Sequence, residues 1–356
     1  MSDNLNKSKK YKALSLFANV GIAEARMKET NVEVVVANEL LNERANFYRD
    51  MHLESEMICG DITDEGVYHQ VISKSKEKNI DFLIATPPCQ GMSIAGQLKE
   101  NDPRNLLIKF VVKAIIDLKP KHVLIENVVG ALKTYILDDG NMIKIVEYIK
   151  RELEPLGYFI NPIVVDVADY GTPQHRKRAL FLISLNKEWI PPIKQKKITV
   201  REAIGHLPSL ESEESSEIPF HIAKKHNDRH ILWMRNTPSG KTAFENKEYF
   251  PQKAGGIRIS GFSTTYKRIS WDKPAPTITM ANGSISSQNN VHPGRKLSNG
   301  KYSDARVLTL KEIFILTGLP EEWVPPLWAS ENLIRHVIGE GVPPKMIVAM
   351  INTLPT

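Results

Sequence analysis

The chain has 356 residues, 42% of them hydrophobic and 25% charged, which is enough for a large buried core in a globular protein. No apolar run approaches the roughly 20 residues of a membrane-spanning helix, and the lysine-rich segment 1–12 is typical of a disordered tail, not of a secretory signal. Two cysteines, Cys59 and Cys89, exclude a disulfide framework and fit a reducing cytoplasm.

The net charge of +6 is unevenly distributed along the chain. Residues 191–305 contain 18 Lys and Arg against 10 Asp and Glu, whereas the remainder contains 29 and 31. A basic segment attached to a near-neutral remainder indicates a surface for a polyanion, with nucleic acid as the first candidate. A solvated basic face without a ligand is the alternative that charge alone leaves open.

The first half of the chain alternates apolar runs with amphipathic stretches. A buried strand is expected at 13–17, followed by a turn and a helix from about Ile22. Further strands are expected at 32–37, 82–85, 122–126, 163–167 and 179–184, and helices at 105–118 and 141–156. This alternation predicts an α/β fold, a doubly wound and mostly parallel sheet in which ligands bind beyond the carboxyl ends of the strands.

After about residue 186 the pattern changes, because prolines, glycines and polar residues dominate. The segments 211–217, 257–263 and 284–290 are expected to be loops or short irregular strands. A helix is expected at 309–319, where Gly318 and Pro320 end it, and a last helix at 345–353 begins after Pro343 and Pro344. The second half therefore predicts a smaller, irregular domain.

The first candidate for chemistry is Cys89. It follows a predicted strand in the run Thr86-Pro87-Pro88-Cys89-Gln90-Gly91, where two prolines fix the backbone just after the strand ends. The polar, glycine-containing segment 91–104 that follows is suited to close over a substrate. Cys89 is thus a candidate nucleophile, although a half-buried structural cysteine fits the same pattern.

Two further motifs place charges at strand ends. Glu126 follows four apolar residues at the end of a predicted strand, which indicates either a functional carboxylate or a partner for a helix N-terminus. Arg176 and Arg178 lie two residues apart, so on an extended chain both point to one face. They predict a clamp for an anion or carboxylate, or else a basic edge strand that prevents aggregation.

The order of these motifs resembles the DNA cytosine-5 methyltransferase family of the bacterial and phage restriction–modification type. Pro88-Cys89-Gln90, then Glu126-Asn127-Val128, then Gln174-x-Arg176-x-Arg178 match three successive family motifs. The resemblance continues through Arg306-x-Leu308-Thr309-x-x-Glu312, Gly318-Leu319-Pro320, Ile338-Gly339 and Val342-Pro343-Pro344. It spans nearly the whole chain except about 187–300, where the family has its variable target-recognition region.

The resemblance implies a mechanism. The Cys89 thiolate adds to C6 of cytosine, Glu126 contacts N3 and the exocyclic amine, and Arg176 and Arg178 orient the base and Glu126. The activated C5 then takes the methyl group of S-adenosyl-L-methionine. Because a duplex hides the reacting atoms in its base stack, the target cytosine must be flipped out.

The resemblance also implies the cofactor contacts, which are Phe17, Ala18, Asn19, Gly21, Glu39, Asp61, Ile62, Pro87 and Val342. Glu39 would hold the ribose hydroxyls and Asp61 would read the adenine amine, with a turn-capping role as the alternative for Asp61. Asn19 stands where the family usually has a glycine, and Asn tolerates the positive φ of such a turn. Glu340 departs from the usual Gly-Asn of the family.

The DNA contacts implied by the resemblance are Gln90, Ser93, Arg104, Gln174, Thr277 and Thr279. The last two belong to the segment 273–279, which is similar to a family segment that touches DNA. His292 and Arg306 also resemble residues of bacterial members. Trp233 and Trp271 are expected in the core, not as base-stacking residues.

Three ranges are expected. Residues 1–187 form the catalytic and cofactor-binding domain, 188–328 the target-recognition domain, and 329–356 a segment that returns to the catalytic domain. The expected partner is double-stranded DNA, and a cognate restriction endonuclease would act on the same site without stable binding to this monomeric, cytoplasmic enzyme. The alternatives are a transfer RNA cytosine-5 methyltransferase and a catalytically inactive DNA-binding homologue. A nicotinamide enzyme is disfavoured because the chain lacks a Gly-x-Gly-x-x-Gly opening.

Overall fold

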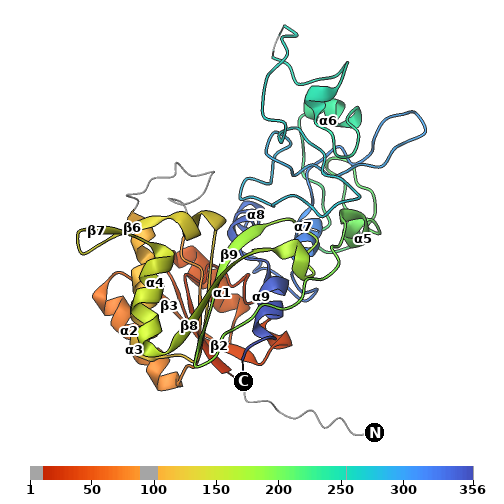
Figure 1. Ribbon diagram of the computed structural model, residues 1–356. Coiled ribbons are helices and arrows are strands. Elements are labelled where there is room, and N and C mark those ends of the chain that lie inside the picture. Colours follow the sequence, from red (N-terminus) through yellow and green to blue (C-terminus); the bar gives the residue numbers. More distant parts are fainter. Residues whose placement is uncertain (1–10, 89–102, 254, 356) are drawn as a thin grey trace. The chain divides into compact units, whose positions relative to one another are not determined.

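The computed structural model describes residues 11–88, 103–253 and 255–355, which form two compact units (Figure 1). The first unit comprises Met1–Asp166, Lys177–Lys194 and Met346–Thr356, and the second comprises Val167–Arg176 and Gln195–Lys345. This division differs from the expected ranges at residues 167–176 and 329–345, which belong to the second unit, and at residues 188–194, which belong to the first.

The first unit is built on a seven-stranded sheet in the order β3-β2-β1-β4-β5-β9-β8. The strands are β1 Tyr11–Leu16, β2 Val32–Glu39, β3 Glu56–Cys59, β4 Phe82–Ala85, β5 His122–Asn127, β8 Tyr158–Asp166 and β9 Lys177–Leu185. The first five pair in parallel, whereas β9 runs antiparallel to both β5 and β8. The predicted α/β fold with a mostly parallel sheet is therefore confirmed.

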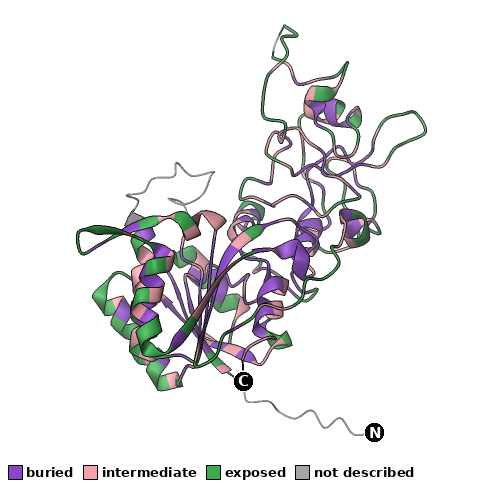
Figure 2. Ribbon diagram, viewed as in Figure 1, coloured by how far each residue is buried: buried purple, intermediate pink, exposed green. Residues whose placement is uncertain are grey.

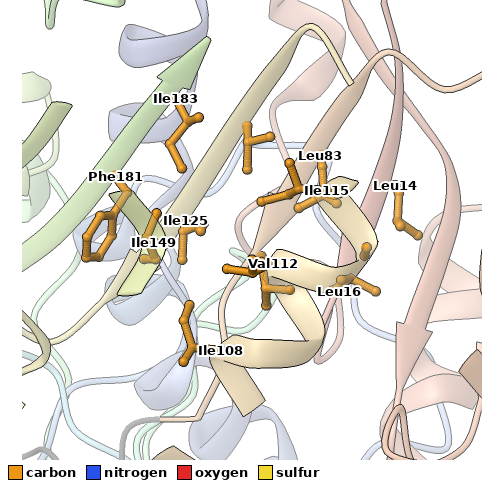
Figure 3. Packing of buried hydrophobic residues seen from close by; sticks show 14 of the residues in the cluster. Leu14, Leu16, Leu83, Ile108, Val112, Ile115, Ile125, Ile149, Phe181 and Ile183 are labelled. Carbon is orange, nitrogen blue, oxygen red and sulfur yellow. The ribbon is translucent and has the colours of Figure 1, made fainter. Parts of the chain in front are cut away.

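Helices cover the sheet of the first unit on both faces. Successive residues of a strand face opposite sides, and on β2 Val36 packs into one apolar cluster and Ala37 into another. The cluster of Val36 includes residues of α2 Glu65–Lys78, α3 Leu107–Leu118 and α4 Ile145–Leu153, and that of Ala37 includes Ala45 and Tyr48 of α1 Asn42–Met51. Figure 3 shows Ile108, Val112 and Ile115 of α3, at helical spacing, against the sheet.

Two predicted helices of the first unit are wrong in part. No α-helix begins at Ile22, because residues 18–27 are linked by i to i−3 backbone bonds that form turns, and only a 3₁₀ turn, η1 Met27–Glu29, follows. The predicted helix 141–156 begins only at Ile145. Its first residues form β7 Asn141–Lys144, which pairs with β6 Tyr135–Asp138 across Asp139 and Gly140, both at positive φ.

The C-terminal helix, α9 Pro344–Ile351, lies close to its predicted range, and its residues from Met346 onward belong to the first unit. The indole of Trp189 donates to the carbonyl of Met350 and the hydroxyl of Thr353, both at 3.2 Å. The same ring packs edge-on against Phe82 of β4. Trp189 therefore connects the end of the chain to the sheet.

The second unit contains few regular elements. Its helices in the described residues are α5 Val200–Ile204, α6 Asp228–Arg235, α7 Leu310–Thr317 and α8 Glu331–Glu340, with the 3₁₀ turns η5 Val167–Tyr170 and η6 Ala243–Glu245. The helix predicted at 309–319 is found as α7, with Thr309 as its N-cap and Gly318 at positive φ after its end. The helix α8 was not predicted. Trp233 and Trp271 are buried, as predicted.

Charged side chains occupy the centre of the second unit. Arg306 pairs with Asp304 at 3.0 Å and with Glu312 at 2.9 Å, and all three are at most 1% exposed. Arg268, also buried, donates to four backbone carbonyls, those of Met234, His292, Ser303 and Asp304. Figure 2 shows buried segments inside both units. No helix within the ranges that the structure describes is long and apolar enough to cross a membrane.

Candidate active site

The predicted site residues of the first unit gather at one edge of its sheet. Because β3, β2, β1, β4 and β5 are parallel neighbours, their carboxyl ends lie along the same edge. That edge carries the loop 17–21 after β1, Glu39 at the end of β2, Asp61 after β3, Pro87 after β4 and Glu126 on β5.

The loop after β1 has an unusual backbone. Phe17, Asn19 and Gly21 all have positive φ, at 60°, 51° and 78°. The side-chain oxygen of Asn19 accepts a hydrogen bond from the N–H of Val20 at 2.8 Å, which stabilises the left-handed turn where the family usually has glycine. At Gly21 a Cβ would lie 2.0 Å from Nε2 of His52, so no side chain fits there. Ala18 is buried, and its N–H donates a hydrogen bond to the carbonyl of Asn38.

Glu39 is buried at the end of β2, 6% exposed, and faces this loop. One carboxylate oxygen accepts from the N–H of Asn19 at 2.9 Å and the other from the N–H of Leu41 at 3.0 Å. A carboxylate offers about four acceptor positions, so these two bonds leave capacity for two hydroxyl donors. The geometry fits the predicted ribose contact.

Asp61 and Ile62 differ from each other in exposure. Asp61 is exposed, and its Oδ1 accepts from both the N–H and the hydroxyl of Thr63, so part of its carboxylate caps a turn. Ile62 is buried in the main apolar cluster of the first unit. A contact of Asp61 with a ligand is compatible with the turn, because the carboxylate has a second oxygen.

The segment before Cys89 is fixed by two neighbouring strands. The hydroxyl of Thr86 donates to the carbonyl of Phe17 at 2.9 Å, and the amide of Asn127 donates to the carbonyl of buried Pro87 at 3.1 Å. The motifs containing Thr86 and Asn127 were noted in the sequence, but neither residue was given a role. Their position at the ends of two predicted neighbouring strands was the available signal.

Three predicted site residues, Cys89, Gln90 and Ser93, lie outside the described residues. Arg104, predicted to contact DNA, is exposed in η2 Pro103–Leu106.

Glu126 forms a buried ion pair with Arg178. Their Oε1 and Nε atoms are 2.6 Å apart, and the side chains are 7% and 14% exposed. Glu126 lies on β5 and Arg178 on the antiparallel neighbour β9, which begins at Lys177. A guanidinium bound to a carboxylate in a partly buried place holds that carboxylate in a defined position. The structure therefore brings together two of the four predicted catalytic residues.

Arg176 and Gln174 bind backbone groups of the second unit. The guanidinium of Arg176 donates to the carbonyls of Ile278, Gly339 and Glu340, each at 3.0 Å. The amide of Gln174 accepts from the N–H of Ile278 and donates to the carbonyl of Leu316, both at 3.2 Å. The prediction of one clamp on an extended strand is wrong in this respect, because the strand begins only after Arg176.

Thr277 and Thr279 belong to the segment that Gln174 and Arg176 hold. The hydroxyl of Thr277 donates to the carbonyl of His175 at 2.7 Å. A Cβ on Gly339 would meet the backbone of Thr279 at 2.4 Å, so this glycine allows α8 to pack closely. Both threonines line a hollow of about 550 Å³ in the second unit, together with Lys267, Lys273, Gln288 and Asn289. The hollow combines cationic and amide side chains.

The two remaining sequence features lie near the end of α8. Val342, a predicted cofactor contact, is buried and belongs to the second unit. Glu340, the departure from the family pattern, forms an i,i+4 pair with His336 at 3.3 Å.

Two solved structures of methyltransferases have a similar fold. A putative DNA modification methyltransferase from an Escherichia coli prophage is similar with a TM-score of 0.69 at 19% identity, over 97% of this chain and 98% of that one. A mutant of DNMT2 from Spodoptera frugiperda is similar with a TM-score of 0.64 at 15% identity, over 97% and 99%. The chain shares the fold of these two methyltransferase structures.

The chain belongs to the C-5 cytosine-specific DNA methylases, because the model of that family matches residues 11–355. Type II methyltransferase M1.HgaI of Avibacterium volantium is 45% identical over 342 residues, 94% of this chain and 95% of that protein. Type II methyltransferase M1.HphI of Haemophilus parahaemolyticus is 28% identical over 313 residues, 86% and 75%. The family resemblance predicted from the motif order is confirmed.

Proposed function

We propose that this enzyme methylates C5 of a flipped-out cytosine in a specific sequence of double-stranded DNA, through a covalent bond between Cys89 and C6. S-adenosyl-L-methionine would supply the methyl group as a sulfonium, which is an electrophile strong enough for the activated ring. The observation that carries the proposal is the buried pair of Glu126 and Arg178 beside Asn127, whose amide holds the carbonyl two residues before Cys89.

The cofactor fits the chain's own residues at the edge of the sheet. Glu39 has acceptor capacity for the ribose hydroxyls, and its carboxylate bonds the N–H of Asn19 in the left-handed loop 17–21 beside it. Asp61 would receive the adenine amine on the oxygen that Thr63 leaves available. Phe17, Ala18, Ile62 and Pro87 would complete the apolar walls, and Val342 stays a proposed contact.

Each catalytic residue would have one task. The thiolate of Cys89 attacks C6 of the cytosine, and negative charge develops on the ring toward N3. The carboxyl of Glu126 contacts N3 and the exocyclic amine, and Arg178 keeps that carboxyl in position. Once C5 has received the methyl group, loss of its proton to water re-forms the C5–C6 double bond and expels the Cys89 thiolate.

The first half of the Gln-x-Arg-x-Arg motif would position DNA-contacting residues. Gln174 and Arg176 are 1% and 4% exposed and bind the backbone at Ile278, so we assign them to the support of Thr277 and Thr279. Those threonines, with Lys267 and Lys273 in the same hollow, would meet DNA phosphates. Gln90, Ser93 and Arg104 stay proposed DNA contacts.

Similarity to two type II methyltransferases supports a restriction–modification role. A cognate endonuclease would then cut the same sequence when it is unmethylated, without stable binding to this chain.

The proposal is tested with tritiated S-adenosylmethionine and unmethylated plasmid DNA. Wild type should place label in DNA as 5-methylcytosine, and Cys89→Ala should lose turnover by at least about a thousandfold, because no other group replaces the nucleophile. Cys59→Ser is the matched control, since it changes the other cysteine, and it should retain turnover.

Near-normal turnover by Cys89→Ala would contradict the covalent mechanism. Label that enters transfer RNA and not DNA would favour the transfer RNA methyltransferase instead. DNA binding without label in either nucleic acid would favour the inactive homologue.

A further inference from the structure

A buried carboxyl group lies beneath the loop 17–21 and has no part in the mechanism above. Glu24 is 4% exposed, and its two oxygens accept hydrogen bonds from the hydroxyls of Ser15 on β1 and Tyr48 on α1. No ion pair to Glu24 occurs within the described part of the chain. A buried carboxylate held only by neutral donors is costly in its charged form.

The environment of this carboxyl changes its charge near neutral pH. Burial raises the pKa of Glu24 to about 7, against the opposing effect of the hydrogen bonds from Ser15 and Tyr48. The group therefore exists in both protonation states in the range where the enzyme would work. Small changes in nearby charge shift the balance between the two states.

The cluster around Glu24 supports the loop directly. Tyr48 stacks on His52 with ring centroids 4.4 Å apart, and the His52 ring fills the space under Gly21. Burial lowers the pKa of His52 to about 4, so this ring is neutral and adds no charge. The other groups that face the cluster are the hydroxyl of Ser55, which Tyr48 contacts at 3.4 Å, and Lys28, whose charge acts on His52.

The proposed cofactor and its product differ in a charge that ionised Glu24 can distinguish. S-adenosylmethionine carries a sulfonium cation, and the product that remains after methyl transfer lacks it. The two ligands thus differ by one positive charge at the same place. A negative charge in a poorly screened, buried position near that place attracts the first ligand more than the second.

We propose that the carboxyl of Glu24, held under the cofactor loop by Ser15 and Tyr48, selects cationic S-adenosylmethionine over its neutral demethylated product and releases its proton when the cation binds. The inference rests on the proposed function only for the place of the cofactor. The released proton passes to the buffer, and the ionised carboxylate remains as the counter-charge of the sulfonium. Product inhibition would thereby be weakened in the wild-type enzyme.

Isothermal titration calorimetry of the full chain tests this directly. Titrations of S-adenosylmethionine and of S-adenosylhomocysteine near pH 7, in buffers of different ionisation enthalpy, measure the protons released on binding. If the cation lowers the pKa of Glu24 by one unit, about half a proton should be released at the midpoint and the affinity should change about tenfold across the titration. S-adenosylhomocysteine should release much less.

Three variants separate this role from a structural one. Glu24→Gln keeps the size and the hydrogen-bonding capacity of the side chain, and it should abolish the proton release and reduce the preference for S-adenosylmethionine severalfold. Tyr48→Phe keeps the carboxyl but removes a donor to it, so the release should move to higher pH. Glu29→Gln changes a nearby exposed carboxylate and should behave like wild type.

The outcomes distinguish this inference from the proposed function. Equal weakening of both ligands by Glu24→Gln, or proton release that persists in that variant, would overturn the inference and leave the proposed function intact. No binding of S-adenosylmethionine to wild type would overturn both. Labelled DNA in the methylation assay with no proton release would overturn the inference alone.

Discussion

The two compact units differ in how their cores combine apolar and charged side chains. The first unit buries aliphatic residues such as Leu14, Leu83 and Ile115, none of them exposed. The second buries charged residues: Arg268, Arg306, Asp304, Glu312 and His292 are all at most 1% exposed. The second unit also has an apolar cluster, which includes Met234 and Ile285, but it adds a group of paired charged side chains that the main cluster of the first unit lacks.

The difference follows from where the backbone hydrogen bonds go. In the first unit the sheet and its helices satisfy the main chain, so the side chains between them can be apolar. The second unit consists largely of irregular segments, whose buried carbonyls need other donors. Arg268 supplies several at once, to the carbonyls of Met234, His292, Ser303 and Asp304. Arg268 therefore satisfies backbone carbonyls of the second unit, as the N–H groups of a neighbouring strand do in a sheet.

The largest expected effect comes from breaking the charged core. Arg306→Ala would leave the carboxylates of Asp304 and Glu312 buried without their bidentate partner, and should destabilise the protein by about 3–5 kcal/mol. Urea unfolding followed by tryptophan fluorescence measures this, because Trp233 and Trp271 are buried in the second unit. Lys225→Ala, which breaks an exposed pair with Glu213, is the control and should leave the midpoint unchanged.

Hydrogen exchange measures which part of the protein Arg306→Ala destabilises. Amides of residues 290–312 should lose protection in Arg306→Ala, whereas β4 and β5 should keep theirs. Equal loss in both regions would show that the two cores are not held by separate interactions.

A smaller loss of folding stability is expected when the pH is lowered. Burial lowers the pKa of His292 to about 3, so between pH 6.5 and 3 the unfolded chain binds a proton that the folded chain does not, and stability falls as the pH falls through that window. From pH 7.5 to 5 this amounts to about 2 kcal/mol. In His292→Asn this contribution should disappear, which denaturant unfolding at the two pH values would measure; an unchanged pH dependence would reject the assignment.

Glu24, a titrating group of the first unit, makes stability depend on pH in the opposite direction. Because burial raises the pKa of Glu24 from 4.5 to about 7, the folded chain holds a proton there that the unfolded chain loses. Glu24 therefore contributes stability that is present below pH 4.5 and is lost as the pH rises through 7. The two acid–base responses thus sharpen the contrast between the units.

The sequence predicted the first unit well because its interactions are periodic. Apolar runs such as 82–85 and 122–126 are buried on both faces of a parallel sheet, and they were read directly as strands. The helix predictions were wrong where the local backbone conformation differed from the one that the hydrophobic period indicated. The Asp139-Gly140 hairpin depends on positive φ, and the segment after Gly21 forms successive i to i−3 turns; hydrophobic spacing reveals neither.

Hydrophobic periodicity does not predict the long-range polar contacts of the second unit and of the site. Nothing local in the sequence indicates that Arg268 is buried, because the carbonyls that it bonds include those of Met234 and Ser303, which lie 34 and 35 residues away along the chain. The motif order identified Glu126 and Arg178 as candidates, but it did not show that Arg176 faces the backbone of Ile278 and Gly339. Long-range pairing of polar groups requires the fold to be known.

The smallest effect tests whether the two cores also differ in rigidity. Ile115 of α3 and Ile285 of the second unit are both fully buried, and Ile→Val removes one methylene at each. The expected range is about 0.5–1.5 kcal/mol, set by how far the surroundings relax into the void. Helices and a sheet relax little, so Ile115→Val should fall near the upper end. Irregular segments shift more easily, so Ile285→Val should fall near the lower end. Chemical denaturation of both variants measures the difference, and equal costs would mean that the charged network makes the loops as rigid as the sheet.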